Sequence, residues 1–260
     1  MHNTKQRSLS NQERIYNKVV NTIINGDCLE VMQSIPDKSI DMILCDLPYG
    51  TTACKWDTII PFEPLWKQYK RVIKNNGAIV LTASQPFTSA LVMSNIKMFK
   101  YEWIWQKEQG TNFMCAKVNP LKAHENITVF YSEMPCYNPQ MKTGKPFISG
   151  KGKDNGVYGG MIKIPRKNNG TRYPKSVIDF KRETGLHPTQ KPVALFEYLI
   201  KTYTNENETV LDNCSGSGTT AIACINTNRN YICIEKDKTY FDLSVERVNN
   251  HKQNLFNKAC

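Results

Sequence analysis

The sequence predicts an α/β protein with a mostly parallel sheet and a loop-rich insertion. Short apolar runs typical of buried strands alternate with segments whose apolar residues recur at helical spacing. Such alternation is typical of a parallel sheet covered by helices on both faces. Between residues 133 and 185 the alternation stops, and eight of the chain's fourteen glycines fall there among basic residues. We therefore expect one catalytic-type domain formed by residues 18–132 and 186–260, with an inserted region over 133–185.

The ends and the cysteines restrict the class of protein. Residues 1–17 are polar, so we expect a flexible N-terminal arm there and no secretory signal. No stretch approaches the ~18 consecutive apolar residues of a membrane-spanning helix. The nine cysteines form no C-x-x-C pair, and Cys45, Cys224 and Cys233 lie inside apolar runs. This pattern indicates buried thiols in a reducing cytoplasm and no metal site.

The expected strands and helices follow from local runs and their stop signals. Each expected strand is an apolar or alternating run bounded by turn-forming residues. The strands are expected at 19–25, 40–45, 78–82, 101–106, 127–131, 209–211 and 231–234. Helices are expected where apolar residues lie three or four positions apart before Pro, Asn or Gly. They are expected at 29–35, at 64–73, at 85–95, from Pro192 through Ile200, and after Gly218 through Ile225.

The turn Asp46-Leu47-Pro48-Tyr49-Gly50 directly follows the apolar run 40–45. In open α/β sheets ligands bind beyond the carboxyl ends of the strands. There Asp46 and the backbone carbonyl of Leu47 can each accept a hydrogen bond from an exocyclic amino group. Pro48 fixes its own φ, and Tyr49 can stack on a planar base. The same residue types also form ordinary turns, so this motif alone fits either interpretation.

A second turn, from Asp212 through Gly216 to Thr220, joins an expected strand to an expected helix. Its glycines allow close approach of a ligand to the backbone, and the helix N-terminus offers N–H groups. Glu235, at the end of the next strand, is placed to bind the two hydroxyls of a ribose. Gly216 and Gly218 with an acid about 20 residues further on also satisfy the dinucleotide fingerprint. A nicotinamide-dependent dehydrogenase is therefore an alternative.

The net charge of +11 is concentrated in one segment. Residues 138–191 contain twelve Lys and Arg against three acids, so they carry +9 of the total. A concentrated basic stretch predicts a polyanionic partner, most simply nucleic acid, whereas the simpler alternative is a solvated basic loop. The candidate DNA-binding residues are Lys142, Lys145, Lys151, Lys153, Lys163, Arg166, Lys167, Arg172 and Lys175.

These blocks together resemble the DNA amino-methyltransferases that methylate N6 of adenine or N4 of cytosine. The Asp46 turn resembles their Asp-Pro-Pro-Tyr motif, with Leu47 where the family usually has Pro. The Asp212 turn resembles their cofactor signature, although Asn213-Cys214 replaces the usual Pro-Phe. The segments 187–192 and 25–27 resemble two further family blocks. The order of the blocks, with the basic region between the catalytic and cofactor blocks, is that of the β group.

The resemblance implies a seven-stranded Rossmann-like methyltransferase sheet, S-adenosyl-L-methionine as cofactor, double-stranded DNA as partner, and 133–185 as the target-recognition region. The catalytic residues it implies are Asp46, Leu47, Pro48 and Tyr49. The cofactor-binding residues it implies are Asp27, Cys28, Asp46, His187, Thr189, Lys191, Asp212, Gly216, Ser217, Gly218, Thr219 and Glu235.

The target base is expected to be adenine, because many cytosine-N4 enzymes of the family carry Ser at the position of Asp46. Cytosine N4 is the alternative, and the base must leave the duplex in either case. An RNA methyltransferase and a non-catalytic DNA-binding protein on the same scaffold are further alternatives. The resemblance also suggests a bacterial or phage-encoded protein of restriction-modification type, for which a homodimer and a cognate restriction endonuclease are expected partners.

Overall fold

The structure is a computed structural model of the chain, and it describes residues 10–52, 54, 57–149, 165–183 and 190–259. Contacts divide it into two compact units, one of Met1–Asn138 with Ser176–Cys260 and one of Pro139–Lys175. The first is called the sheet unit below, and the second the basic unit.

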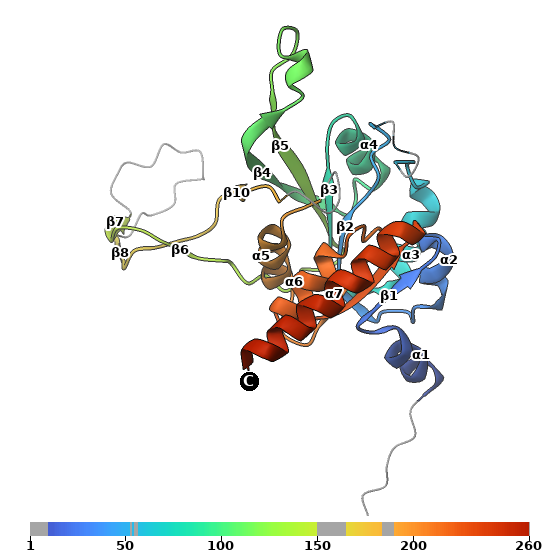
Figure 1. The fold of residues 1–260 in the computed structure, drawn as a ribbon. Helices are drawn as coiled ribbons and strands as arrows, with labels where there is room; N and C mark the ends of the chain where they lie inside the picture. The colour runs from blue at the N-terminus through green and yellow to red at the C-terminus, as the bar shows by residue number, and fades with distance from the viewer. Residues whose placement is uncertain (1–9, 53, 55–56, 150–164, 184–189, 260) are drawn as a thin grey trace, which may run out of the picture. The chain divides into compact units, whose positions relative to one another are not determined.

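The sheet unit contains an eight-stranded sheet (Figure 1). The strands are β1 (Thr22–Asn25), β2 (Ile40–Asp46), β3 (Ile73–Ala83), β4 (Phe99–Thr111), β5 (Lys122–Phe130), β10 (Val177–Asp179), β11 (Thr209–Asp212) and β12 (Asn230–Glu235). Their order is β1-β12-β11-β2-β3-β5-β4-β10, and β5 runs antiparallel to its neighbours while the other pairs are parallel. The mostly parallel α/β fold is therefore confirmed. The short β10 extends the expected seven strands at one edge.

Helices cover both faces of this sheet. They are α1 (Asn11–Val19), α2 (Cys28–Val31), α3 (Phe62–Val72), α4 (Phe87–Ser94), α5 (Val193–Tyr203), α6 (Thr219–Asn226) and α7 (Lys238–Ala259), with short 3-10 turns η1 (Met32–Ser34) and η2 (Phe113–Cys115). Helices α2, α3 and α4 pack on one face, and α5, α6 and α7 lie on the other (Figure 1). Two buried clusters fill the space between the sheet and these two helical layers.

Strand β2 shows how alternation assigns side chains to the two faces. Ile43 and Cys45 belong to the cluster beneath α3 and α4, whereas Met42 and Leu44 belong to the cluster beneath α5 and α6. All four side chains are completely buried. Since Asp46 is two residues after Leu44, its side chain lies on the α5–α6 face, at the carboxyl end of the strand.

Two helices differ from the sequence-based expectation. Helix α1 occupies residues 11–17 of the expected flexible arm, and its start has a capping box in which Ser10 Oγ accepts from the Glu13 N–H and Glu13 accepts from the Ser10 N–H. The 22-residue α7 was not expected at all. Among the described residues, no helix is long and apolar enough to cross a membrane.

The basic unit consists of two short antiparallel ladders. Strand β6 (Lys142–Thr143) pairs with β9 (Thr171–Arg172), and β7 (Phe147–Ser149) pairs with β8 (Arg166–Asn168). Gly170 has a φ of +102° and an added Cβ would lie 2.3 Å from the Gly144 carbonyl oxygen, so the turn between β8 and β9 requires glycine.

Candidate functional site

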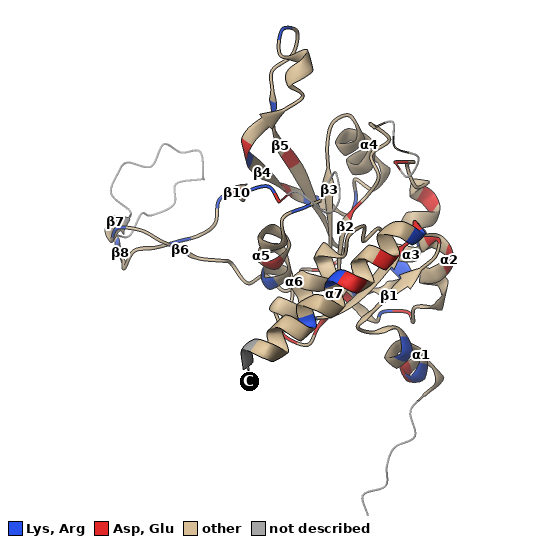
Figure 2. Ribbon diagram, viewed as in Figure 1, with Lys and Arg blue, Asp and Glu red and all other residues tan. Residues whose placement is uncertain are grey.

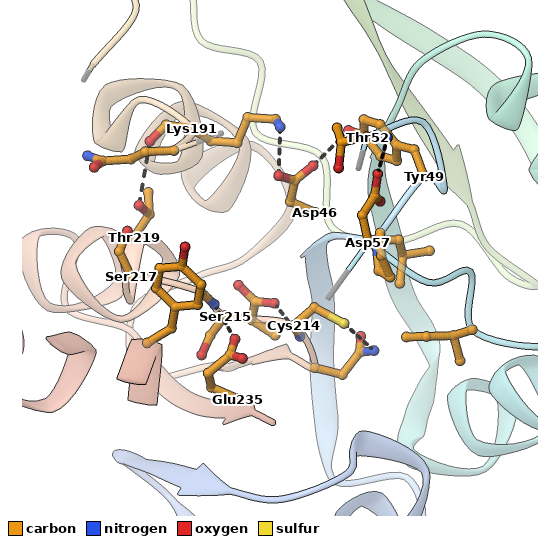
Figure 3. Close-up of a pocket in the computed structure, with 18 of the residues that line it drawn as sticks. Asp46, Tyr49, Thr52, Asp57, Lys191, Cys214, Ser215, Ser217, Thr219 and Glu235 are labelled. Carbon is orange, nitrogen blue, oxygen red and sulfur yellow. Dashed lines mark hydrogen bonds and ion pairs between the residues drawn. The ribbon is translucent and has the colours of Figure 1, made fainter. Parts of the chain in front are cut away.

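One cleft of about 920 Å³ opens at the carboxyl ends of β2, β11 and β12 in the sheet unit (Figure 3). The Asp46 turn after β2 and the Gly216 turn after β11 both line it, although they are 170 positions apart in the sequence. Parallel β2 and β11 are neighbours in the sheet, so their carboxyl ends meet at the same edge.

Strand alternation brings further polar side chains to this edge. Thr82 lies opposite Asp46 in the register of β2 and β3 and shares the α5–α6 face with Val80. Lys107 is two residues after Trp105 of β4, and Glu125 is two residues before Ile127 of β5, so both lie on that face too. Because β5 is antiparallel, the beginning of this strand reaches the edge where β2 and β4 end.

Asp46 is the centre of a hydrogen-bonded cluster. The Tyr49 hydroxyl donates to Asp46 Oδ1 at 2.7 Å, and Thr82 Oγ1 donates to the same oxygen. Lys191 Nζ donates to Asp46 Oδ2 at 2.6 Å (Figure 3). Asp46 is thereby held in one orientation by contacts from its own turn, from β3 and from the segment before α5.

Lys191 connects Asp46 to a second carboxylate. Its side chain is only 5% exposed, and Nζ lies 3.3 Å from Glu125 Oε2. Glu125 Oε1 in turn accepts from Lys107 Nζ. Burial by itself lowers the pKa of Lys191, but the charges of Asp46 and Glu125 outweigh it and hold the pKa above its ordinary value. For Glu125, burial is outweighed by Lys191 and Lys107, and its pKa is lowered. All of these contacts stabilise the charged forms.

Asp57 fixes the loop that follows the Asp46 turn. Its carboxylate accepts from the backbone N–H groups of Gly50, Thr51 and Thr52 at 2.8, 2.9 and 2.7 Å. Burial raises its pKa, but the Thr52 side chain and these N–H groups outweigh burial, so the pKa is lowered. Gly50 has a φ of +66°, and an added Cβ would lie 2.9 Å from the Ile59 side chain. The loop therefore depends on both Gly50 and Asp57.

The Tyr49 ring packs against Phe87 of α4, with ring centroids 5.3 Å apart and planes at 29°. Lys191 Nζ lies 5.6 Å from the Tyr49 ring centroid. Burial and the charges of Asp46 and Glu125 raise the pKa of the Tyr49 phenol well above its ordinary value. The phenol is thus a hydrogen-bond donor to Asp46 at neutral pH.

The Gly216 turn has its own internal contacts. The Gly216 N–H donates to Glu235 Oε2 at 2.7 Å, and Asp212 accepts from the Cys214 N–H at 3.1 Å and from Thr220 Oγ1. Burial raises the pKa of Asp212 to about 7. Gly218 precedes α6 with a φ of +81°, which favours glycine.

Asp27 follows β1, Glu235 ends the neighbouring strand β12, and both residues line the cleft. Asp27 accepts from the Leu29 N–H at 2.9 Å as the N-cap of α2, and from Lys236 Nζ at 3.0 Å. Burial raises the pKa of Asp27, but Lys236 and the Leu29 N–H outweigh it, so the pKa is lowered. Burial raises the pKa of Glu235. Glu235 keeps acceptor capacity beyond its contacts with Gly216 and Asp237.

Most of the residues singled out from the sequence meet in this cleft. Those that line it are Asp27, Cys28, Asp46, Leu47, Pro48, Tyr49, Lys191, Asp212, Gly216, Ser217, Thr219 and Glu235. Gly218 is not among the lining residues and lies between two of them. His187 and Thr189 lie outside the described residues.

The sequence motifs assign no role to several residues of the cleft, namely Asp57, Lys107, Glu125 and Ser215, nor to Thr82, which contacts Asp46. Ser215 Oγ is buried without a hydrogen-bond partner among the described residues. Thr82 lies inside an expected strand, and strand alternation from Val80 indicates its face. For Glu125 the useful signal is an acid two residues before the apolar run 127–131.

Six of the nine candidate DNA-binding residues are described residues of the basic unit. They are Lys142, Lys145, Arg166, Lys167, Arg172 and Lys175. Figure 2 shows Lys and Arg in blue on β6 and β8. Lys151, Lys153 and Lys163 lie outside the described residues. Arg172 stacks over Phe147, with Cζ 4.2 Å from the ring centroid, and donates to Asn168 at 2.8 Å. Its guanidinium therefore also supports the two ladders.

Known proteins with similar sequences and folds agree on one class. The chain is 28% identical over 252 residues to the Type II methyltransferase M2.MboI of Moraxella bovis, covering 86% of each chain. It is 28% identical over 247 residues to the DNA adenine methyltransferase YhdJ of Escherichia coli (strain K12), covering 87% of this chain and 82% of that one.

Among solved structures, the M1.HpyAVI–SAM complex is 25% identical with a TM-score of 0.60, over 87% of this chain and 98% of that one. The cytosine-N4-specific PvuII DNA methyltransferase is 15% identical with a TM-score of 0.64, over 91% and 92% of the two chains, and supports the fold alone.

The family model N6_N4_Mtase, described as DNA methylase, matches residues 40–246. This range contains both the Asp46 turn and the Gly216 turn. The dehydrogenase alternative rested on the glycine spacing alone and is thereby left without support. The chain belongs to the N6/N4 DNA methylase family.

Proposed function

We propose that this DNA methyltransferase transfers a methyl group from S-adenosyl-L-methionine to N6 of an adenine flipped out of double-stranded DNA. The observation that supports the proposal is the shared cleft, which Asp46 and Gly216 both line. A methyl donor and an everted base must meet in one cavity, and 920 Å³ is the size of a cavity that can hold both.

The cleft's residues fit S-adenosylmethionine, which is the donor of this family. Glu235 offers carboxylate acceptors for two ribose hydroxyls, and the backbone of Gly216 and Ser217 can lie against the ligand. Asp46 brings negative charge to a ligand that carries a sulfonium and an ammonium, and Asp212 lines the same cleft. The buried Ser215 Oγ is an orphaned polar atom that a polar ligand can satisfy. When bound, the donor supplies an electrophilic methyl group on its sulfonium.

The role proposed for Asp46 and Leu47 is to orient the target nitrogen. The lone pair of an exocyclic amino group is conjugated into the ring, so the nitrogen is a poor nucleophile. Asp46 and the Leu47 carbonyl would each accept one N–H and favour a nitrogen whose lone pair is available to the methyl group of the donor. Positioning and the charge of Asp46 supply the catalysis, and the proton lost afterwards passes to Asp46 or water. Tyr49 would stack on the base.

Adenine is the proposed target base for two reasons. The first position of the catalytic turn is Asp46, whereas many cytosine-N4 enzymes of the family carry Ser there. One similar protein, YhdJ, is a DNA adenine methyltransferase by name. Cytosine N4 is the alternative, since the chemistry of the turn serves either amino group.

The basic unit is the proposed DNA contact. Lysines and arginines bind phosphates and position the duplex, whereas a smaller number of side chains read base edges in the grooves. Arg166 and Lys167 on β8 and Lys142 on β6 lie in the basic unit, and none of the unit's described residues lines the cleft. The cleft and the DNA contact would then be formed by different residues. The salt dependence of DNA binding can therefore be measured separately from methyl transfer. A homodimer and a cognate restriction endonuclease belong to the proposal as well, and light scattering tests the first.

The test uses radiolabelled S-adenosylmethionine and bacterial genomic DNA amplified in vitro, which carries no methylated bases. After transfer, the DNA is digested to nucleosides and the label is assigned by chromatography. We expect the label in N6-methyl-2′-deoxyadenosine and none with Asp46→Ala. Label in N4-methylcytosine would contradict the adenine assignment, and no label in DNA would contradict the function.

A further inference from the structure

Two partly buried carboxylates share one buried ammonium in the cleft. Lys191 Nζ lies 2.6 Å from Asp46 Oδ2 and 3.3 Å from Glu125 Oε2. The Glu125 side chain is 13% exposed, and its other oxygen, Oε1, accepts from Lys107. The contact of Oε2 with Lys191 is an ion pair that is too poorly aligned to be a hydrogen bond. The charges of the four side chains cancel, which burial of such a group requires.

The hydrogen bonds of Asp46 determine which of its oxygens is open to a substrate. An ionised carboxylate oxygen accepts about two hydrogen bonds. Oδ1 already accepts from Tyr49 and Thr82, so its capacity is used. Oδ2 accepts from Lys191 and retains capacity for one more donor. An incoming amino group must therefore donate to Oδ2, the oxygen that Lys191 already contacts.

We infer that Glu125 is a positioning residue for methyl transfer, which holds Lys191 beside Asp46 so that Oδ2 keeps one lone pair for the target amino group. The inference rests on the proposed function and deepens it. It adds Glu125, a residue to which neither the sequence motifs nor the family match gives a role.

The physical reason is competition between the two carboxylates for the same cation. With only Asp46 as its partner, the charge of Lys191 would be balanced by that carboxylate alone, and Oδ2 would be a weaker acceptor for the substrate. Glu125 shares the charge of Lys191 without lengthening the Lys191–Asp46 contact, which is 2.6 Å. Lys107 keeps Glu125 ionised and in place, as the lowered pKa of Glu125 indicates. When the amino group donates to Oδ2, Lys191 can shift toward Glu125 Oε2.

The test is a double-mutant cycle of Glu125→Gln and Lys191→Met. The single-turnover rate of methyl transfer is measured at saturating S-adenosylmethionine with a duplex containing the recognition site, which is identified beforehand by sequencing DNA methylated by the wild-type protein. Cofactor affinity is measured in parallel by calorimetry. The matched control is Glu102→Gln, because Glu102 is also a carboxylate of the β4–β5 pair but contacts Asn126 and does not line the cleft.

We expect Glu125→Gln to slow transfer about tenfold, with cofactor affinity within about twofold of wild type and with the control unchanged. In the Lys191→Met background, Glu125→Gln should change the rate less than about twofold, because residues acting through one contact are non-additive. The double variant loses one negative and one positive charge, so the cluster stays neutral and the protein is expected to fold.

Three results would overturn the inference. One is a wild-type rate for Glu125→Gln. Another is equal slowing in both backgrounds, which would mean that Glu125 does not act through Lys191. The third is a loss of cofactor affinity as large as the loss of rate, which would assign Glu125 to the cofactor pocket. Failure of the proposed function is distinguishable, because the wild-type protein would then transfer no methyl group at all.

Discussion

The backbone N–H of Gly216 donates to Glu235 Oε2 at 2.7 Å. This contact joins the turn after β11 to the end of β12, the neighbouring strand, and both residues line the cleft. The glycine turn and the acid Glu235, which together suggested a nucleotide-type cofactor, are therefore in direct contact. A ligand that reaches the Gly216 backbone also reaches the Glu235 carboxylate.

A bulky side chain at Gly216 should abolish cofactor binding. Gly216 has a φ of +50°, which strains an L residue, and its side chain would project at the wall of the cleft. We expect Gly216→Arg to weaken S-adenosylmethionine binding at least about 100-fold in calorimetry. Gly144→Arg is the control, because an added Cβ there meets only Arg172 side-chain atoms at 3.6 Å or more. Unchanged affinity of Gly216→Arg would mean that the donor binds elsewhere.

Removing the Asp46 carboxylate should separate chemistry from cofactor binding. Asp46→Ala removes the acceptor for the target amino group, and we expect transfer to fall about 10³-fold, the loss typical of a preorganised electrostatic contact. Cofactor affinity by calorimetry should remain within about threefold. Asp41→Asn, on the same strand but outside the cleft, should retain near wild-type transfer. A near wild-type rate for Asp46→Ala in a radiolabel assay would falsify the catalytic role.

Asp212 should make the unfolding free energy depend on pH. Its pKa is raised by burial from 3.8 to about 7, so the folded protein holds a proton that the unfolded chain releases at lower pH. The stability from this group is full below pH 3.8 and is lost as the pH rises through about 7, with a slope of up to about 1.4 kcal/mol per pH unit.

Asp212→Asn stays neutral at every pH and is the comparison for this effect. In urea titrations, the unfolding free energy of Asp212→Asn minus that of the wild type should increase between pH 5 and pH 7 and level off near pH 8. A difference that does not change with pH would show that the Asp212 carboxyl titrates normally in the folded protein.

Neutralising the basic unit should reduce the salt dependence of DNA binding. Each phosphate contact adds about 0.9 to the slope of log affinity against log salt. We expect glutamine at four lysines of the unit to lower the slope by up to about 3–4 in fluorescence anisotropy titrations. These lysines are Lys142, Lys145, Lys167 and Lys175, and Arg172 is left intact because it stacks on Phe147. The control changes four exposed lysines of the sheet unit, Lys18, Lys67, Lys97 and Lys201, and should leave the slope unaltered. An equal slope for both sets would mean that the basic unit does not bind phosphates.

Local sequence was enough to predict the two turns and the strands before them. Ile40–Asp46 and Thr209–Asp212 are short apolar strands that end in an acid. The apolar run predicts the strand, and the acid marks its carboxyl end. The α1 helix was overlooked although Ser10 and Glu13 have the spacing of a capping box. The α7 helix lacks a strong apolar stripe, since it is polar over most of its length.

The Lys191–Glu125 pair could not be found from local patterns. The two residues are 66 positions apart, and they meet only because β5 runs antiparallel between β3 and β4 and begins at the edge where β2 ends. Strand direction is set by long-range pairing, which no motif in the sequence encodes. By contrast, Asp46 and Gly216 could be assigned to one edge because parallel strands share their carboxyl ends.

The most direct test of the central claim is sequencing, with detection of modified bases, of DNA from methylation-deficient cells that express the chain. We predict N6-methyladenine at one short recurring sequence with the wild-type protein, and its absence with Asp46→Ala. N4-methylcytosine at that sequence, or N6-methyladenine that persists with Asp46→Ala, would contradict it.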